Sequence, residues 1–530
     1  MRSVYLQIPS KLIKRISLLY LLIPFLIFCL GFLKILFGIP IALILIGIIL
    51  RNWRKNHVDE GVFFLPRRIL IYTISCVLIW ALLSGIGGFA FQNSDFHTRN
   101  AIFRDLINYD WPVKYIYSTN TTLTTYNLAY YIGFWLPAAL VGKLGGWQIA
   151  NLALYFWAVA GIFLTLVILF STNKSKPLYF VLLLIFFSGM DSLGTIILGL
   201  AVSPGKFFAS FWPPIRHLEW WIPVFQYSSF TTQLFWVFNQ AIPAWLCMIL
   251  IWSADNRKSI FLVWSLCAFY APLPALGMLP FLALKIPNEL FNPENIKGHQ
   301  SFTPSSSLVS RFWNDLRSII TLENILGGGI VLCITYFYFA ANVISSDLKF
   351  VPMDIIQWTY YIFFIVFEAL ILWLVLFKKH KYNLYWYVVG LLILIIPLIM
   401  AGKTHDFSMR ASIPALFMLL IWSAETLASP KSNMRTVVMI ILIIGAITPI
   451  YEINRSIYRT ENYFLNPPSQ AEKLSGQEIK IYEIESFEYD HPFTLTADSF
   501  KSLANIDPKT IPYFLATPDN SFFYEYLSRR

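Results

Sequence analysis

Charged residues are scarce in this chain. Only 13% of its 530 residues are Asp, Glu, Lys or Arg, whereas 57% are hydrophobic and 17% are aromatic. A soluble chain of this length would suggest roughly three or four domains. That class is excluded here, because apolar runs recur along most of the sequence.

Cysteines are few and scattered as well. All five lie inside apolar runs and their number is odd, so they indicate neither a disulfide framework nor a zinc site. We find no cleavable signal peptide, because the first apolar run is too long and lacks a small-residue cleavage site. We also find no internal repeat that would indicate an inverted-repeat transporter.

The chain has long apolar runs instead. A bilayer core of about 30 Å needs roughly 20 apolar residues for each crossing helix. The runs predict an α-helical polytopic membrane protein with on the order of 12 to 14 crossings. The candidate spans are residues 16–33, 35–50, 69–91, 128–144, 149–170, 178–200, 241–254, 260–286, 325–343, 361–377, 384–401, 413–427 and 437–451.

The net charge of +11 could suggest nucleic acid, but the distribution of the basic residues excludes it. The cytoplasmic loops of membrane proteins are enriched in Lys and Arg. With a cytoplasmic N-terminus, the cytoplasmic stretches hold 22 of these residues and the opposite loops hold 8. The protein is therefore expected in the plasma (inner) membrane, in contact with membrane lipids. The cytoplasmic stretches are 1–15, 51–68, 171–177, 255–259, 285–318, 378–382 and 431–435; the opposite loops are 92–125, 201–240, 344–358 and 403–410.

Strict alternation of spans cannot place both Lys143 and Lys174 on the cytoplasmic side. Either the run 128–144, which Pro137 interrupts, dips into the membrane and returns, or a later span consists of two half-helices. Run 260–286, with several prolines at its centre, is predicted to be another broken hairpin.

The chain divides into a transmembrane domain, residues 1–453, and a polar tail, residues 454–530. We expect the tail to form a small mixed α/β region on the extracytoplasmic side, docked on the membrane domain. The aromatic residues of NSFFYEYLSRR, near the C-terminus, would pack there.

The first extracytoplasmic loop, residues 92–125, carries several charges directly after an apolar span. Its residues 96–108 have helical periodicity and predict an amphipathic helix on the membrane surface. Asp95 precedes this helix. Either Ser94 or Asp95 caps the helix and Asp95 pairs with Arg99, or Asp95 is a catalytic base, with His97 as a proton carrier. Under the second interpretation Arg99 is a substrate contact.

The run Ser94-Asp95-Phe96-His97 resembles the corresponding loop of the GT-C superfamily of membrane glycosyltransferases, and about a dozen spans with an extracytoplasmic C-terminal region are similar too. Protein O-mannosyltransferases and bacterial aminoarabinose transferases belong to this group. The paired Asp-Glu that several of its families carry is missing, and the next catalytic acid would be Asp105. The resemblance implies inverting transfer of a sugar from a polyprenyl-phosphate-linked donor to a glycan, lipid or protein acceptor.

The donor phosphate that the resemblance implies needs cations near the membrane surface. We expect them in the segment GKTHDFSMRASIP, where the candidate substrate-binding residues are Lys403, His405, Asp406 and Arg410. Alternatively, Asp406 and Arg410 only pair with each other, or the Arg410 side chain extends to the membrane surface. His405 is then either a second contact or merely solvated.

A further loop, within 201–240, is rich in aromatic residues. An interfacial aromatic belt explains that composition, but aromatic faces beside amides and acids also suit sugar rings. Asp191 is either a substrate contact or a helix cap. The candidate substrate-binding residues here are Asp191, Arg216, His217, Glu219, Trp220, Trp221 and Gln240.

No cofactor is predicted with certainty. A divalent cation, which some GT-C relatives use, could involve Asp95 and His97, but two ligands are too few for us to predict a metal site. A polysaccharide polymerase or ligase, with Arg-rich late loops, is an alternative function. A lipid or solute transporter is another, and Glu368 inside a span is its best support, unless Glu368 only makes a hydrogen bond between helices.

Overall fold

The structure is a computed structural model and describes residues 5–55, 61–118, 123–172, 176–202, 214, 217–254, 257–285, 313, 316–342, 348–401, 406–465, 514–517 and 521–529. Within these residues, seven helices are long and apolar enough to cross a membrane, and five shorter apolar helices accompany them. These helices fit an integral membrane protein, so the expected helical polytopic class is confirmed at that level.

The helices are separated by short turns and a few short strands. The helices are α1 Ser10–Phe32, α2 Ile35–Lys55, α3 Arg67–Leu83, α4 Asp95–Asn108, η1 Ile132–Phe134, α5 Leu136–Thr172, α6 Pro177–Phe186, α7 Asp191–Val202, η4 Leu218–Trp221, α8 Phe230–Trp252, α9 Ile260–Tyr270, α10 Pro272–Lys285, η5 Glu323–Gly328, α14 Gly329–Ala340, α15 Ile355–Ile365, η6 Val366–Leu370, α16 Ile371–Val375, α17 Phe377–His380, α18 Leu384–Ile395, η7 Ile396–Leu398, α19 Asp406–Ala411, α20 Ile413–Ala428, α21 Asn433–Gly445, α22 Ile447–Leu465 and η9 Phe523–Leu527. The strands are β1 Tyr5–Pro9, β2 Val62–Pro66, β3 Lys114–Ser118, β4 Leu123–Leu128, β5 Leu348–Phe350, β6 Ile399–Ala401 and β7 Leu515–Ala516.

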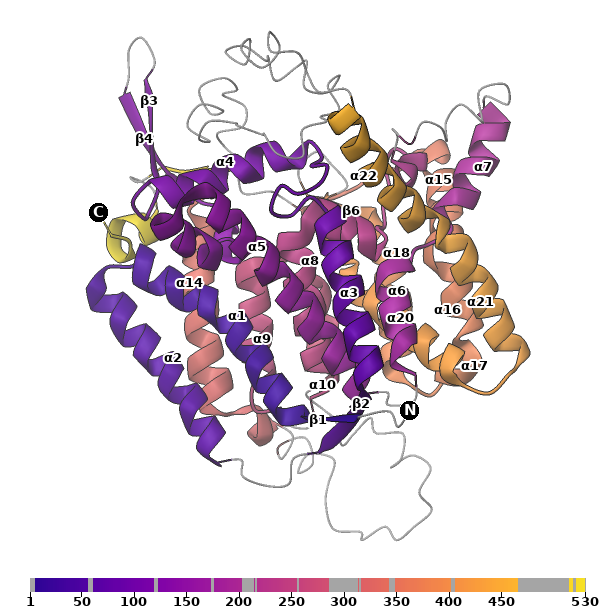
Figure 1. Cartoon of the computed structure of the whole chain (residues 1–530), viewed down its shortest axis with the longest axis horizontal. Helices are drawn as coiled ribbons and strands as arrows, with labels where there is room; N and C mark the ends of the chain where they lie inside the picture. The colour runs from indigo at the N-terminus through magenta and orange to yellow at the C-terminus, as the bar shows by residue number, and fades with distance from the viewer. Residues whose placement is uncertain are drawn as a thin grey trace.

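The long helices run between two ends of a bundle (Figure 1). Helix α4 lies across one end, beside the β3–β4 hairpin, and we call this the α4 end. The antiparallel pair β1–β2 lies at the other end, with the N-terminus and α17. Helix α8 is at the centre, because 94% of its apolar window is buried, whereas only 28% of the window spanning α15 and α16 is buried. The peripheral helices therefore turn apolar side chains outward, where lipid would lie.

Helix α3 ends at Leu83, earlier than the predicted span 69–91. Gly85, Gly87 and Gly88 follow with φ values of 81°, 84° and 76°, a backbone conformation that side chains disfavour. At Gly85 a Cβ atom would also lie 2.4 Å from the carbonyl oxygen of Phe91. The glycines thus fold this stretch into a compact turn that leads directly into α4.

Helix α4 matches the predicted amphipathic helix, and its apolar residues Phe96, Phe103, Leu106 and Ile107 are buried. Ser94 makes no side-chain capping bond, so the capping interpretation is wrong for Ser94.

The predicted span 128–144 lies along α4. Lys143 Nζ donates to the carbonyl oxygen of Tyr109, at the C-terminal end of α4, at 2.5 Å. The Trp147 ring lies 5.5 Å from the Phe103 ring of α4. Between these two contacts α5 is kinked at Gly146, where φ is 77°. The first part of α5 therefore stays at the α4 end, which agrees with the alternative in which this run returns without crossing.

Several other predicted spans are interrupted. Run 178–200 is divided between α6 and α7, and Met190 N between them donates to the carbonyl oxygen of Phe367 at 3.0 Å. Run 260–286 breaks into α9 and α10, which pack together through Trp264 Nε1 and the carbonyl oxygen of Ala275 at 2.8 Å. Such breaks are stable in lipid because neighbouring protein groups satisfy the freed backbone.

Helix α22 crosses the predicted boundary between residues 453 and 454 and continues to Leu465. Residues 466–513, on which most of the expected α/β region falls, lie outside the described residues. The later part of the tail docks on the bundle: β7 pairs with β4, and buried Phe523 packs against Phe28 and Tyr338. The predicted packing of the last aromatic residues is thereby confirmed.

This topology predicts which side of the membrane residue 148 faces. In a cysteine-free background, Gln148→Cys should react with a membrane-impermeant maleimide from the same side as Asp110→Cys. Lys381→Cys, beside α17, should react only from the opposite side. All three positions are exposed. If Gln148→Cys reacts together with Lys381→Cys, the first part of α5 crosses the membrane and the arrangement is wrong.

Candidate functional site

Two of the predicted site residues form an ion pair at the start of α4. Arg99 Nη2 lies 2.7 Å from Asp95 Oδ2, one helical turn away. The Arg99 side chain is only 6% exposed, whereas that of Asp95 is 41% exposed. The guanidinium lies 5.8 Å and 5.9 Å from the ring centres of Phe96 and Phe238, so aromatic faces cover the cation.

A second pair with the same spacing occurs in α19. Arg410 Nη1 lies 2.9 Å from Asp406 Oδ1, and the two side chains are 9% and 50% exposed. The pairing expected for these residues is therefore present. In both pairs the arginine is buried and the aspartate is about half exposed.

Tyr130 and Tyr131, in the loop between β4 and η1, connect the two pairs. Their rings lie 3.7 Å apart. Burial raises the pKa of Tyr130 well above its ordinary value, and Tyr131 raises it further, while Arg99 and Arg410 both lower it. Both arginines therefore act on the same phenol.

Asp95 also acts electrostatically on Arg410. Burial lowers the pKa of Arg410, but Asp406 and its other neighbours outweigh burial and the net shift is upward. Asp95 is one of those neighbours, so it lies within electrostatic reach of Arg410. We call this group of six residues the paired-arginine site: Asp95, Arg99, Tyr130, Tyr131, Asp406 and Arg410.

Each arginine of this site has an unused donor. Among the residues that the structure describes, Arg99 Nη1 and Arg410 Nε are buried and make no hydrogen bond. A buried donor without an acceptor costs about 1–3 kcal/mol. Two such donors, on arginines that both act on Tyr130, suit a multivalent anion such as a phosphate, which accepts several hydrogen bonds at once.

The tail and α14 hold the tyrosine loop in place. Ala129 N donates to the carbonyl oxygen of Phe514 at 2.8 Å, and the Phe514 ring lies 4.7 Å from the Tyr130 ring. From α14, Tyr338 Oη donates to the carbonyl oxygen of Tyr130 at 2.9 Å. The sequence offered no signal for Tyr130 or Tyr131, because these contacts join segments that are far apart in the chain.

Other predicted members of this group are not brought to it. Asp105 is fully buried and accepts a hydrogen bond from Tyr115 Oη at 2.8 Å. It lies ten residues after Asp95, which is about 15 Å along a helix, so it is no second carboxylate for the same reaction. The side chain of His97 lies outside the described part of the chain, and so do Lys403 and His405.

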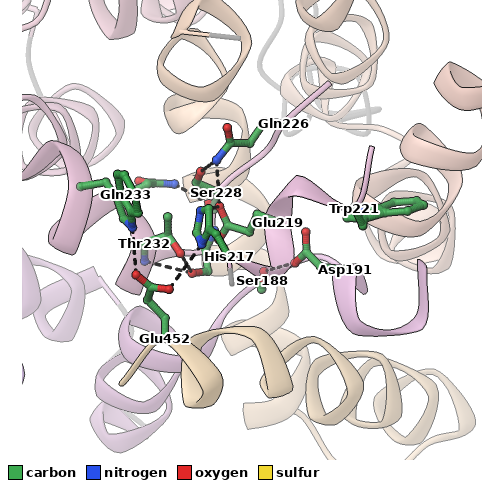
Figure 2. A network of polar contacts seen from close by, with 12 residues as sticks. Ser188, Asp191, His217, Glu219, Trp221, Gln226, Ser228, Thr232, Gln233 and Glu452 are labelled. Carbon is green, nitrogen blue, oxygen red and sulfur yellow. Dashed lines mark hydrogen bonds and ion pairs between the residues drawn. The ribbon is translucent and has the colours of Figure 1, made fainter. Parts of the chain in front are cut away.

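A second polar region lies beside the N-terminal part of α8 (Figure 2). His217 is buried between two carboxylates: its Nε2 lies 3.5 Å from Glu219 Oε2 and its Nδ1 lies 3.3 Å from Glu452 Oε2. Glu452, on α22, also accepts a hydrogen bond from Trp236 Nε1 at 2.8 Å and lies 3.6 Å from Arg455 Nη2. We call these residues, with the acids described next, the His217 network.

Glu219 fixes the start of α8. Its Oε1 accepts from Ser229 N at 2.8 Å, and its Oε2 accepts from Gln226 Nε2 at 3.2 Å. Ser229 in turn caps α8 by accepting from Thr232 N. Burial raises the pKa of Glu219 to about 7, against the opposing effect of His217.

Two further acids lie at the break between α6 and α7. Asp191 Oδ2 accepts from Ser188 Oγ at 2.8 Å, and Trp221 Nε1 donates to Glu368 Oε1 at 3.0 Å. Gly189 lies against Glu368, because a Cβ atom there would be 2.0 Å from Oε2. The hydrogen bond between elements that was the simpler expectation for Glu368 is therefore present.

Helix α8 separates the two regions and contributes to both. Its Trp236 contacts the His217 network, and its Phe238 covers Arg99. Gln240 is buried on the same helix. Trp220 is 57% exposed beside the His217 ring, and Arg216 lies outside the described residues. Predicted residues thus fall into two neighbouring groups instead of one cleft.

Among the described residues, no group of three or more His, Cys, Asp or Glu side chains could hold a metal ion. No protein-family model, curated protein or solved structure matches the chain.

The raised pKa of Glu219 predicts a pH-dependent stability. Its folded pKa is about 7, against an ordinary value of 4.5. Between these two pH values the folded state keeps a proton on Glu219 that the unfolded state releases. The contribution of this proton to the free energy of unfolding is therefore fully present below about pH 4.5 and is lost as the pH rises through 7. The loss should be on the order of 2–3 kcal/mol.

The apparent Tm of the purified protein should fall between pH 5 and pH 8, and Glu219→Gln should flatten that slope. Glu461→Gln, at an exposed acid of α22, is the matched control and should keep the wild-type slope. Equal slopes in wild type and Glu219→Gln would contradict the assignment of this proton.

Proposed function

We propose that this protein is a membrane glycosyltransferase of the GT-C type. It moves a sugar from a polyprenyl-phosphate-linked donor to an acceptor on the extracytoplasmic face, with Asp95 as the general base. The acceptor is a glycan, a lipid or a protein. One observation carries the proposal: two buried arginines from distant segments, each with an unused donor, both act electrostatically on Tyr130, and the half-exposed carboxylate of Asp95 acts on both of them.

The arginines suit the donor phosphate. A guanidinium binds phosphate oxygens in a planar, bidentate manner and stays charged when buried. The donor is a lipid, so its chain would extend from the α4 end between the peripheral helices, whose outward residues are apolar. We place this end outside the cytoplasm, in the plasma (inner) membrane, because the loops opposite it are rich in Lys and Arg.

The chemistry follows from these positions. Asp95 takes the proton of the acceptor hydroxyl, and the hydroxyl oxygen forms a bond to the anomeric carbon of the sugar. The bond between that carbon and the phosphate oxygen breaks on the opposite face, so the configuration inverts. The phosphate leaves with the electron pair, and Arg99 and Arg410 stabilise its charge.

A transporter is the second candidate, and the acids at the α6–α7 break favour it. Asp191, Glu219 and Glu368 are buried at 1%, 1% and 5% exposure, and buried acids beside broken helices occur on ion pathways. The paired-arginine site has no evident use in such a pathway. A polymerase or ligase would retain activity when Asp95 is neutralised, so the test below separates it as well.

The first test replaces the base. Asp95→Asn should fold normally and lose about 10²–10⁴-fold in transfer rate, because the amide cannot accept the proton. The assay uses purified protein in nanodiscs, a panel of polyprenyl-phosphate sugars and a membrane extract as acceptor, and measures released polyprenyl phosphate. Asp110→Asn, at the exposed end of the same loop, should keep wild-type activity. Full activity in Asp95→Asn would end the catalytic proposal.

The second test removes a phosphate contact. Arg99→Gln should weaken donor binding and slow transfer, because a cation that stabilises the leaving phosphate is gone. Arg104→Gln is the matched control on the same helix, since Arg104 lies 4.6 Å from the Trp147 ring centre, away from the site. If both variants change the donor concentration dependence equally, the role of Arg99 is not specific.

A further inference from the structure

We propose that donor phosphate and the two aspartates exchange places on the arginines, so that Asp95 is released as a base only when phosphate is bound. This inference rests on the proposed function and concerns how the paired-arginine site is controlled. It assigns Asp406 a role that the reaction itself does not require: it is the carboxylate that holds Arg410 until phosphate arrives.

The ion pairs leave part of each guanidinium available. An arginine offers five N–H donors in a planar fork. Asp95 occupies Arg99 through Nη2, while the buried Nη1 makes no hydrogen bond; Asp406 occupies Arg410 through Nη1, while the buried Nε makes none. Each arginine therefore has a donor for a phosphate oxygen besides the one that its carboxylate occupies.

The difference in burial between the arginines and the aspartates determines which side chain of each pair is displaced when phosphate binds. The arginine side chains are 6% and 9% exposed, so neither can turn to water without leaving its covering. The aspartate side chains are 41% and 50% exposed, and water can hydrate their carboxylates when they leave. Displacing an aspartate costs little, whereas displacing an arginine would strand a buried charge.

Charge balance favours the same exchange. In the paired state the two aspartates neutralise the two arginines, so the site has no net charge to attract an anion strongly. An arriving phosphate competes with Asp95 and Asp406 for the same donors, and repels both carboxylates. Their departure leaves two cations against the single negative charge of the donor phosphodiester, and the second charge that the phosphate gains when the sugar leaves is then neutralised as well.

The consequence concerns Asp95. While Arg99 donates to Oδ2, the carboxylate of Asp95 is held toward Arg99 and one of its acceptor sites is occupied. Once phosphate occupies Arg99, the carboxylate can turn toward the acceptor hydroxyl. The base is thus oriented for the reaction when the donor is in place, and an acceptor that binds without a donor meets a carboxylate held on Arg99.

The test measures phosphate binding without any sugar transfer. Full-length protein in nanodiscs is titrated with farnesyl phosphate, with farnesol as the neutral control and inorganic phosphate as the headgroup alone. If a carboxylate competes with phosphate, Asp406→Asn should tighten the Kd for farnesyl phosphate about tenfold, which is about 1.4 kcal/mol. Asp95→Asn should tighten it similarly, and Arg410→Gln should abolish it.

The controls and outcomes separate the two proposals. Asp110→Asn should leave the Kd unchanged, and the apparent Tm of each variant reports its folding. Weaker or unchanged binding in folded Asp406→Asn overturns the exchange, and so does a wild type that binds neither phosphate ligand. Equal binding of inorganic and farnesyl phosphate supports exchange with the headgroup alone. Tighter binding in Asp406→Asn without release of polyprenyl phosphate from any sugar donor supports the exchange and overturns the glycosyltransferase.

Discussion

The guanidinium of Arg99 is buried, and a buried charge is stable only with a partner of opposite charge and a suitable covering. The residues at the α4 end of the bundle supply a carboxylate and aromatic rings for it. Asp95 supplies the carboxylate from the preceding turn, and Phe96 and Phe238 supply the cover. Phe238 is available because α8 lies at the centre of the bundle, and α4 lies flat because its apolar face is buried on the helices below. The buried charge of Arg99 is thus stabilised by groups from both α4 and α8.

The same constraint explains where the chain departs from regular helix. In lipid, irregular backbone is stable only where protein groups satisfy it. The glycine turn after α3 and the break between α6 and α7 both meet other segments that contact or hydrogen-bond them. Polar side chains also lie beside these two interruptions, because α4 begins after the glycine turn and Asp191 lies at the α6–α7 break.

The sequence predicted the local features well and the long-range ones poorly. The amphipathic face of α4 and the spacing of Asp95 with Arg99 and of Asp406 with Arg410 depend on a few neighbouring residues, and helical periodicity reveals them. The effect of both arginines on Tyr130 depends on the position of the tyrosine loop, which Phe514 of the tail and Tyr338 of α14 hold and which no local pattern encodes. The end of α3 was misplaced because apolar residues continue through its glycine turn. Glu452 and Arg455 were overlooked because a span was expected to stop at residue 451, whereas α22 continues to Leu465.

We propose that Arg99 and Arg410 together form a site for the phosphate of a membrane lipid. The most direct measurement is a cryo-electron microscopy structure of the protein in nanodiscs that contain undecaprenyl phosphate, compared with one in nanodiscs without it. We expect phosphate density between the two guanidinium groups, a lipid chain that leaves between helices, and an Asp95 carboxylate turned away from Arg99. Lipid phosphate bound elsewhere, with both aspartate–arginine pairs intact, would contradict it.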